Sequence, residues 1–348
     1  MLLSAEPTVR TASSEDRGVA AWLLVVALLV FAMVALGGWT RLSHSGLSMV
    51  DWRPVTGVLP PLSAAGWEEA FAAYRSSPEF LLVNSDMDLD GYRSIFWLEY
   101  LHRALGRILG LAFVIPLVVF TVRGAIAPRR LPVFLGLLAL GGLQGLVGWW
   151  MVRSGLVDRP EVSHFRLAVH LGLAALLFCA LMWTALGIAR PGRGPALPLA
   201  HSALVALALC SLTLLLGALV AGLDAGLVYN TFPLMAGGIL PPGFPGPAGP
   251  LSSPGAVQFL HRSAGLLTLA WIGLCWLRSR SAGLSRRPRR LFAATGLVAL
   301  VQVALGIATL LGQVPTGLAL LHQACALLLL ALLVMLVHAL WRPPADVF

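Results

Sequence analysis

Eight apolar segments, each long enough to cross a bilayer, constrain this chain more than any other feature. A transmembrane helix needs about 20 apolar residues to cross a hydrocarbon core of about 30 Å. Since 58% of the 348 residues are hydrophobic and only 11% are charged, a soluble globular fold is excluded. The sequence therefore predicts an all-α polytopic membrane protein with eight transmembrane helices. The expected helices cover residues 20–40, 95–121, 131–152, 165–189, 200–222, 257–277, 291–311 and 318–340.

The distribution of arginine predicts the orientation in the membrane. The connections after the second, fourth and sixth segments, together with the C-terminal tail, carry 12 Arg and no acidic residue before Asp346. By the positive-inside rule, both termini are expected in the cytoplasm of a bacterium, or in the matrix of a mitochondrion. The net charge of +9 is then explained by the arginines on the cytoplasmic side, which set the topology and attract anionic lipid. It does not indicate a nucleic-acid partner.

Motifs in the first half return in the second half, in the same order. Both outer loops, at 41–94 and 223–256, contain a Gly-Leu step followed further along by Leu-Pro-Pro, at 59–61 and 240–242. This pattern predicts two parallel-duplicated four-helix bundles. The matched positions are His102 and His261, Gln144 and Gln302, and His170 and His322, at offsets of 159, 158 and 152 residues. The predicted divisions are an N-terminal tail (1–19), an N-terminal half (20–190), a C-terminal half (191–342) and a short tail (343–348).

The four repeated histidines are candidate metal ligands. His102 and His170 form one expected pair, and His261 and His322 form the other. Two imidazoles from facing helices can serve as axial ligands of a heme iron. The alternative is that each histidine only hydrogen-bonds a neighbouring helix, which is also the simplest explanation of the two glutamines.

Arginines follow the first histidine of each pair. Arg103 and Arg262 are candidates for binding heme propionates, because a guanidinium group binds a carboxylate bidentately. The alternative is that each arginine reaches from a helix end to the membrane surface.

One difference between the halves suggests that their sites have different roles. Glu99 precedes His102 by three residues and so lies on the same helix face, whereas Gln258 stands before His261. A carboxyl group can move protons or stabilise developing positive charge, which an amide cannot do. We therefore expect one reactive site and one site for electron transfer or structure. The alternative for Glu99 is an ion pair with Arg103.

These motifs together resemble the heme A synthase family, in its alphaproteobacterial and mitochondrial-type branch. The resemblance rests on Glu-x-x-His-Arg at 99–103, the second His-Arg at 261–262, the single histidines at 170 and 322, and the loop sequences at 45–61 and 229–235. It implies oxidation of the C8 methyl group of heme O to a formyl group by successive hydroxylations. The product, heme A, would serve aa3-type cytochrome c oxidase.

The resemblance also implies roles for particular residues. His261 and His322 would hold a heme B cofactor, His102 and His170 would hold the substrate heme, and Glu99 would be catalytic. Some bacterial members carry a cysteine pair in the first outer loop, which this chain lacks between residues 41 and 94. A mechanism that needs such a pair is therefore not expected here.

The implied partners and location follow from the same resemblance. Beyond heme O, heme A and membrane lipid, the expected partners are a heme O synthase, cytochrome c oxidase assembly factors, an unidentified electron acceptor and further copies of the chain. The expected location is the bacterial inner membrane, with the heme sites towards the periplasm. Two other functions are alternatives: a quinol-linked diheme b-type electron carrier, and a transporter built on repeats, against which the four matched histidines argue.

Overall fold

The computed structural model describes residues 12–50, 57–157, 160–189 and 198–341, and these residues form α-helices joined by loops and short 3-10 turns. Eight of the described helices are long and apolar enough to cross a membrane. The prediction of an all-α multi-pass membrane protein is therefore confirmed. The helices are α1 (Ser14–Leu42), α2 (Ala64–Arg75), α3 (Pro78–Leu82), α4 (Leu89–Val122), α5 (Leu131–Arg153), α6 (His164–Ala189), α7 (Ala200–Gly222), α8 (Pro254–Ser279), α9 (Arg286–Leu311) and α10 (Thr316–Trp341), with 3-10 turns at Pro128–Arg130 and Ala225–Leu227.

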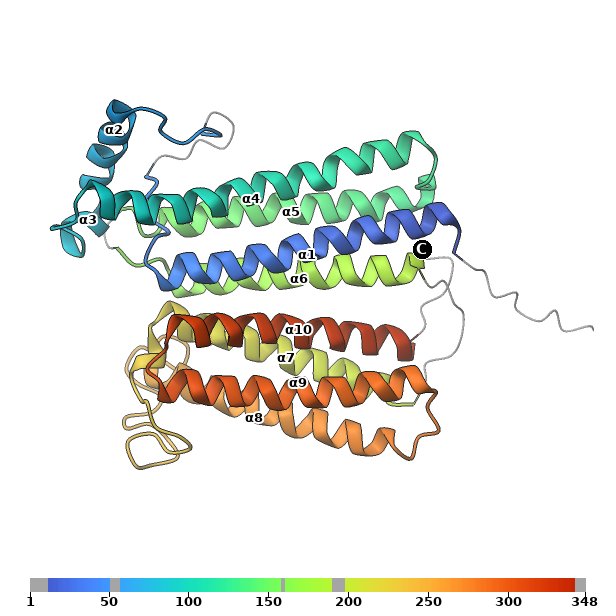
Figure 1. Ribbon diagram of the computed structural model, residues 1–348. Helices are drawn as coiled ribbons and strands as arrows, with labels where there is room; N and C mark the ends of the chain where they lie inside the picture. Colours follow the sequence, from blue (N-terminus) through green and yellow to red (C-terminus); the bar gives the residue numbers. More distant parts are fainter. Residues whose placement is uncertain (1–11, 51–56, 158–159, 190–197, 342–348) are drawn as a thin grey trace, which may run out of the picture.

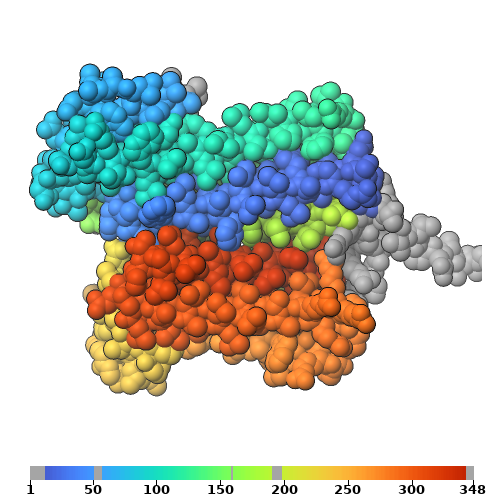
Figure 2. All heavy atoms as spheres, in the orientation of Figure 1, coloured from blue at the N-terminus to red at the C-terminus, as the bar shows by residue number. Residues whose placement is uncertain are grey.

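The eight long helices pack as two groups of four. Helices α1, α4, α5 and α6 contact one another, as do α7, α8, α9 and α10. The groups meet along α1, α6, α7 and α10, and Figure 2 shows α1 and α10 lying against each other at the boundary. The described start of α1 and the end of α10 lie at the same end of the bundle (Figure 1). The opposite end, which carries α2 and α3, is called the loop end below.

Apolar side chains cover both the inside and the outside of this bundle. The inner faces of α1, α6 and α10 are tightly packed, with Leu23, Leu181 and Leu330 fully buried. Other large apolar side chains, such as Leu28 on α1 and Ile115 on α4, are exposed. An outer surface of this kind is stable only when lipid tails replace water around it.

Helix α4 is longer than a membrane crossing requires. Its 34 residues span about 51 Å, whereas the hydrocarbon core is about 30 Å thick. Asp88 is the N-cap of the helix, and its side chain accepts a hydrogen bond from the Gly91 N–H at 2.8 Å. Glu99 and His102 therefore lie in the loop-end part of α4, where helix and outer loop can meet.

The described part of the first outer loop contains two short helices that the sequence analysis did not predict. It contains α2 and α3, and each begins at a serine N-cap, Ser63 or Ser77. Aromatic side chains from these helices stack on the projecting turns of α4, with Tyr74 and Tyr92 ring centroids 5.1 Å apart. The loop is thus fixed to the same helix that carries Glu99 and His102.

Glu79 on α3 is a buried carboxyl group within this aromatic cluster. Its side chain accepts a hydrogen bond from the Tyr74 hydroxyl at 3.2 Å. Burial raises the pKa of Glu79 to about 7; the Tyr74 hydrogen bond opposes this rise and the charge of Glu99 adds to it. Because the folded state holds the proton more tightly than the unfolded chain, the stability that protonated Glu79 contributes is lost as the pH rises through about 7.

We expect α2 and α3 to become less stable between mildly acidic and mildly alkaline pH. The free energy of unfolding of this region should fall by at most about 3 kcal/mol, the value that follows from the difference between the pKa of Glu79 in the folded and unfolded states. Hydrogen exchange of residues 64–82 measured across this range should show increasing exchange after correction for the intrinsic rate. Glu79→Gln should remove the trend, and an equally steep trend in that variant would contradict this explanation.

Candidate metal centres at the loop end

Each of the four repeated histidines packs against a glycine on a neighbouring helix. A methyl group added at any of these glycines would lie 2.9 to 3.0 Å from the imidazole Cε1, closer than packed atoms allow. The glycines therefore let the imidazoles approach the neighbouring backbone closely. The pairs are Gly37 with His102, Gly148 with His170, Gly217 with His261, and Gly306 with His322.

His261 and His322 face each other across the second group of helices. Their ring centroids are 6.3 Å apart and the rings are nearly perpendicular, at 84°. His261 Nδ1 lies 3.0 Å from the Thr213 carbonyl oxygen, and His322 Nδ1 lies 3.1 Å from that of Gln302. A hydrogen bond from Nδ1–H to a carbonyl fixes the tautomer and leaves Nε2 as the metal-binding nitrogen.

The spacing of this pair fits one metal atom between the rings. If both imidazoles bound one metal atom, the distance between their ring centroids would be about 6 Å. This sum consists of two metal–nitrogen bonds of about 2 Å each and, at both ends, the distance from the nitrogen to the ring centre. Among the described residues, no group of three or more His, Cys, Asp or Glu side chains could hold a metal ion. Pairs of imidazoles without further ligands suit a heme, which brings its own equatorial nitrogens.

His102 and His170 are held differently from the second pair. His102 Nδ1 is buried and has no hydrogen-bond partner among the described residues. His170 Nδ1 lies 3.1 Å from the side-chain nitrogen of Gln144, which also donates to the His170 carbonyl at 3.0 Å. Backbone carbonyls therefore orient both imidazoles of the second pair, and neither imidazole of the first.

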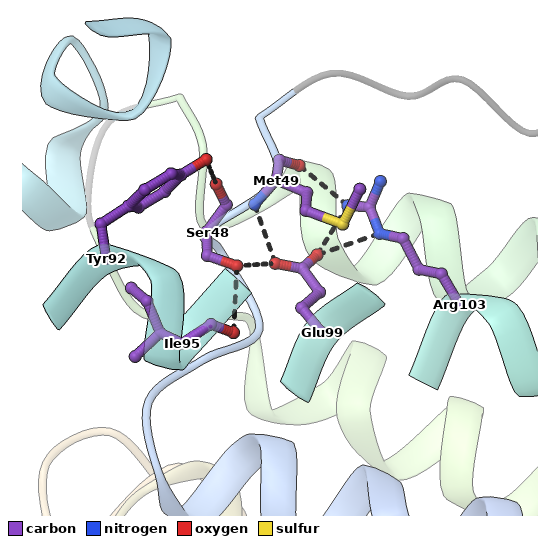
Figure 3. Close-up of polar contacts among 6 residues, drawn as sticks. All are labelled: Ser48, Met49, Tyr92, Ile95, Glu99 and Arg103. Atoms are coloured by element: carbon purple, nitrogen blue, oxygen red, sulfur yellow. Dashed lines mark hydrogen bonds and ion pairs between the residues drawn. The ribbon is translucent and has the colours of Figure 1, made fainter. Parts of the chain in front are cut away.

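Glu99 is buried beside the first pair, with 3% of its surface exposed. Its Oε1 accepts hydrogen bonds from Arg103, at 2.6 Å from the terminal nitrogen and 3.1 Å from Nε. Its Oε2 accepts from the Ser48 hydroxyl at 2.7 Å and from the Met49 N–H at 2.8 Å (Figure 3). The ion pair considered as the alternative for Glu99 is therefore present, together with two contacts to the outer loop.

The corresponding residues of the second half also hold their outer loop. The Gln258 amide donates to the carbonyls of Ala225 and Tyr229, at 2.8 and 3.2 Å. Arg262 donates to Tyr229 at 2.6 Å and to Thr231 at 2.8 Å, and Arg103 likewise donates to the Met49 carbonyl at 2.8 Å. The two arginines thus bind loop carbonyls at matching places.

Ser48 and Met49 are site residues that the sequence analysis missed. The sequence does contain a signal for them: residues 46–49 read Gly-Leu-Ser-Met, and residues 226–229 read Gly-Leu-Val-Tyr. An alignment of the two loops places Met49 opposite Tyr229, whose carbonyl binds Arg262. Only the folded structure shows that both residues contact Glu99.

The two groups of helices are also joined close to both histidine pairs. Gln323, which follows His322, donates from its side-chain nitrogen to the Val34 carbonyl of α1 at 2.6 Å. The same side chain packs against Gly38, next to the glycine that contacts His102. At the loop end, Arg41 forms an ion pair with Asp224 at 2.9 Å. Helix α1 therefore holds the two candidate centres in a fixed relation.

The close glycine contacts predict that Gly306→Ala will displace the His322 imidazole. Disturbing a contact that orients a metal ligand typically lowers the affinity for the metal 10-fold to 100-fold. We therefore expect the affinity for heme at His261 and His322 to fall at least about 10-fold. Titration of heme into purified protein, followed by absorbance, measures this. Gly296→Ala is the matched control, since it lies on the same helix with open space around it. Equal affinity in the two variants would show that the contact does not matter.

Comparisons with known proteins agree with this arrangement. The model of a family described as Cytochrome oxidase assembly protein matches residues 20–334. The heme A synthase of Rhodospirillum centenum is 46% identical over 340 residues, covering 95% of this chain and 90% of the relative. The heme A synthase of Caulobacter vibrioides is 47% identical over 337 residues, covering 95% and 98%. The chain therefore belongs to the heme A synthase family of cytochrome oxidase assembly proteins.

Proposed function

We propose that this protein is a membrane oxidoreductase that converts heme O into heme A for aa3-type cytochrome c oxidase. The observation that carries the proposal is the difference between two similar histidine pairs. One pair has a buried carboxylate, Glu99, three residues away, and the other has the Gln258 amide at the matching position. Membership of the heme A synthase family gives the reaction that such a site would perform.

We assign the resident cofactor, heme B, to His261 and His322. Their facing rings and fixed Nδ1 atoms suit permanent axial ligation. When bound there, a heme supplies one-electron redox chemistry. We assign the substrate heme to His102 and His170, because a ligand pair that the backbone orients less firmly suits a group that must enter and leave.

In this proposal Glu99 is the catalytic residue. Each hydroxylation replaces a C–H bond of the C8 methyl group by a C–O bond. With water as the oxygen donor, two electrons pass to the electron acceptor, positive charge develops near the methyl carbon as they leave, and two protons are released, of which one comes from the C–H bond. A carboxylate on the same helix face as His102 can accept that proton or stabilise that charge. The Arg103 ion pair keeps this carboxylate buried and in one place.

Arg103 and Arg262 are our candidates for binding heme propionates. Both lie directly after a proposed ligand and are anchored to the outer loops. The Nε of Arg262 is buried without a partner among the described residues, so this guanidinium group can still donate a hydrogen bond.

We further propose a parallel duplication with divisions at 20–190 and 191–342, supported by the matching glycine–histidine and arginine–loop contacts. The arginine distribution supports an inner-membrane location with cytoplasmic termini and heme sites towards the periplasm. A heme O synthase and cytochrome c oxidase assembly factors are the expected protein partners, with an electron acceptor still to be identified.

Expression in a host that makes heme O but lacks its own heme A synthase tests the function. Hemes extracted from the membranes and identified by chromatography and mass should include heme A and a hydroxylated intermediate. Extraction of heme O alone would contradict the proposal. Two stable, unmodified hemes that quinol reduces would instead support the diheme electron carrier.

A further inference from the structure

The two oxygens of Glu99 have different partners. Among the described residues, Oε1 accepts hydrogen bonds only from Arg103, a neighbour on the same helix. Oε2 is bound to Ser48 and Met49 of the outer loop, which lie about 50 residues away in the chain (Figure 3). Hydrogen bonds to a charged acceptor are stronger than neutral ones. Together these four bonds fix the orientation of the carboxylate group. The two loop contacts keep Oε2 turned away from Arg103.

The loop segment that binds Oε2 is held in place without Glu99. Arg103 donates to the Met49 carbonyl at 2.8 Å, and the Tyr92 hydroxyl contacts the Ser48 carbonyl at 3.4 Å. Ser48 itself is 1% exposed, so its hydroxyl does not exchange partners with water. The segment is therefore a fixed support, and the carboxylate is the part that it positions.

The second half serves as an internal control for the Ser48 hydroxyl. At the position that matches Ser48 stands Val228, which has no hydroxyl group, and the position that matches Glu99 is Gln258. The amide nitrogen there donates to loop carbonyls, and the amide oxygen has no donor among the described residues. The hydroxyl group thus occurs in the half that has a carboxylate to receive it.

We infer that Ser48 is a positioning residue for Glu99, whose hydroxyl holds the carboxylate in its working orientation beside the substrate heme. The inference deepens the proposed function and rests on it, because Glu99 must act in the reaction for its orientation to matter. Loss of the hydroxyl leaves Oε2 with the Met49 N–H alone, so the carboxylate can rotate about its side-chain bonds.

The first test measures heme A formation at matched protein levels in a host that makes heme O. Ser48→Ala should slow formation about 10-fold, the size expected for losing one charge-assisted hydrogen bond. Ser48→Thr keeps the hydroxyl and should recover most of the rate. Ser45→Ala is the matched control, because Ser45 is equally buried in the same loop and its hydroxyl is bonded only to Ser43.

The second test does not depend on turnover. The infrared carboxylate stretching band that disappears in Glu99→Gln should shift in Ser48→Ala and stay in place in Ser45→Ala, because the frequency responds to hydrogen bonds. An unshifted band in Ser48→Ala, or an unchanged rate in that variant, would overturn the inference while leaving the proposed function intact. Absence of heme A from the host that expresses the wild-type protein would overturn the proposed function. The infrared result would still report whether Ser48 holds Glu99.

Discussion

Replacement of Glu99 by glutamine is expected to reduce heme A formation at least about 100-fold, the usual contribution of a positioned acid or base. Glutamine has nearly the same shape, so the variant should still fold. It copies the arrangement of the second half, where Gln258 meets its loop without a carboxylate. The measurement is the rate of heme A accumulation in a heme O-producing host, at equal protein levels.

Glu79→Gln is the matched control for this substitution. Glu79 is also a buried carboxyl group at the loop end, with 4% of its surface exposed, and it receives the same change of side chain. We expect that variant to form heme A at a rate close to that of the wild type. Comparable losses in the two variants would mean that a general disturbance of the outer loop, and not the chemistry of Glu99, explains the result.

Replacement of His261 or His322 by alanine is expected to remove the resident heme. Each imidazole is one of the two side chains that would hold the heme, and loss of either would leave one protein ligand where two are proposed. Absorbance of the purified protein should show loss of the heme B spectrum, and heme A formation should stop with it. His102→Ala should keep heme B and lose conversion, which separates the two sites.

His201→Ala controls for the general effect of deleting an imidazole. His201 is exposed on α7, where it packs against Trp341. We expect the heme content of the His201→Ala protein to equal that of the wild-type protein. Retention of heme B by both His261→Ala and His322→Ala would show that the cofactor is bound elsewhere.

The long helices and the histidine pairs could be predicted because their signals are local. Apolar runs mark the transmembrane segments within a few residues; for example, α7 covers the expected residues 200–222. The motifs that recur along the sequence predicted that His261 and His322 form a pair, and the structure places their ring centroids 6.3 Å apart.

The outer loop was harder to predict because its order depends on tertiary contacts. Helices α2 and α3 are short, and what stabilises them is packing of residues such as Tyr74 against Tyr92 on α4. The Ser63 and Ser77 caps could have indicated where they begin. The contacts of Glu99 with Ser48 and Met49 join segments about 50 residues apart, and no pattern within one segment reports them.

The heme content of purified Glu99→Gln protein tests the central claim most directly. The claim is that one pair of histidines holds a permanent cofactor and the other holds a substrate that Glu99 helps to oxidise. Protein purified from a heme O-producing host should contain heme B together with unmodified heme O. Recovery of heme A from this variant, or of two heme B molecules and no heme O, would contradict the account.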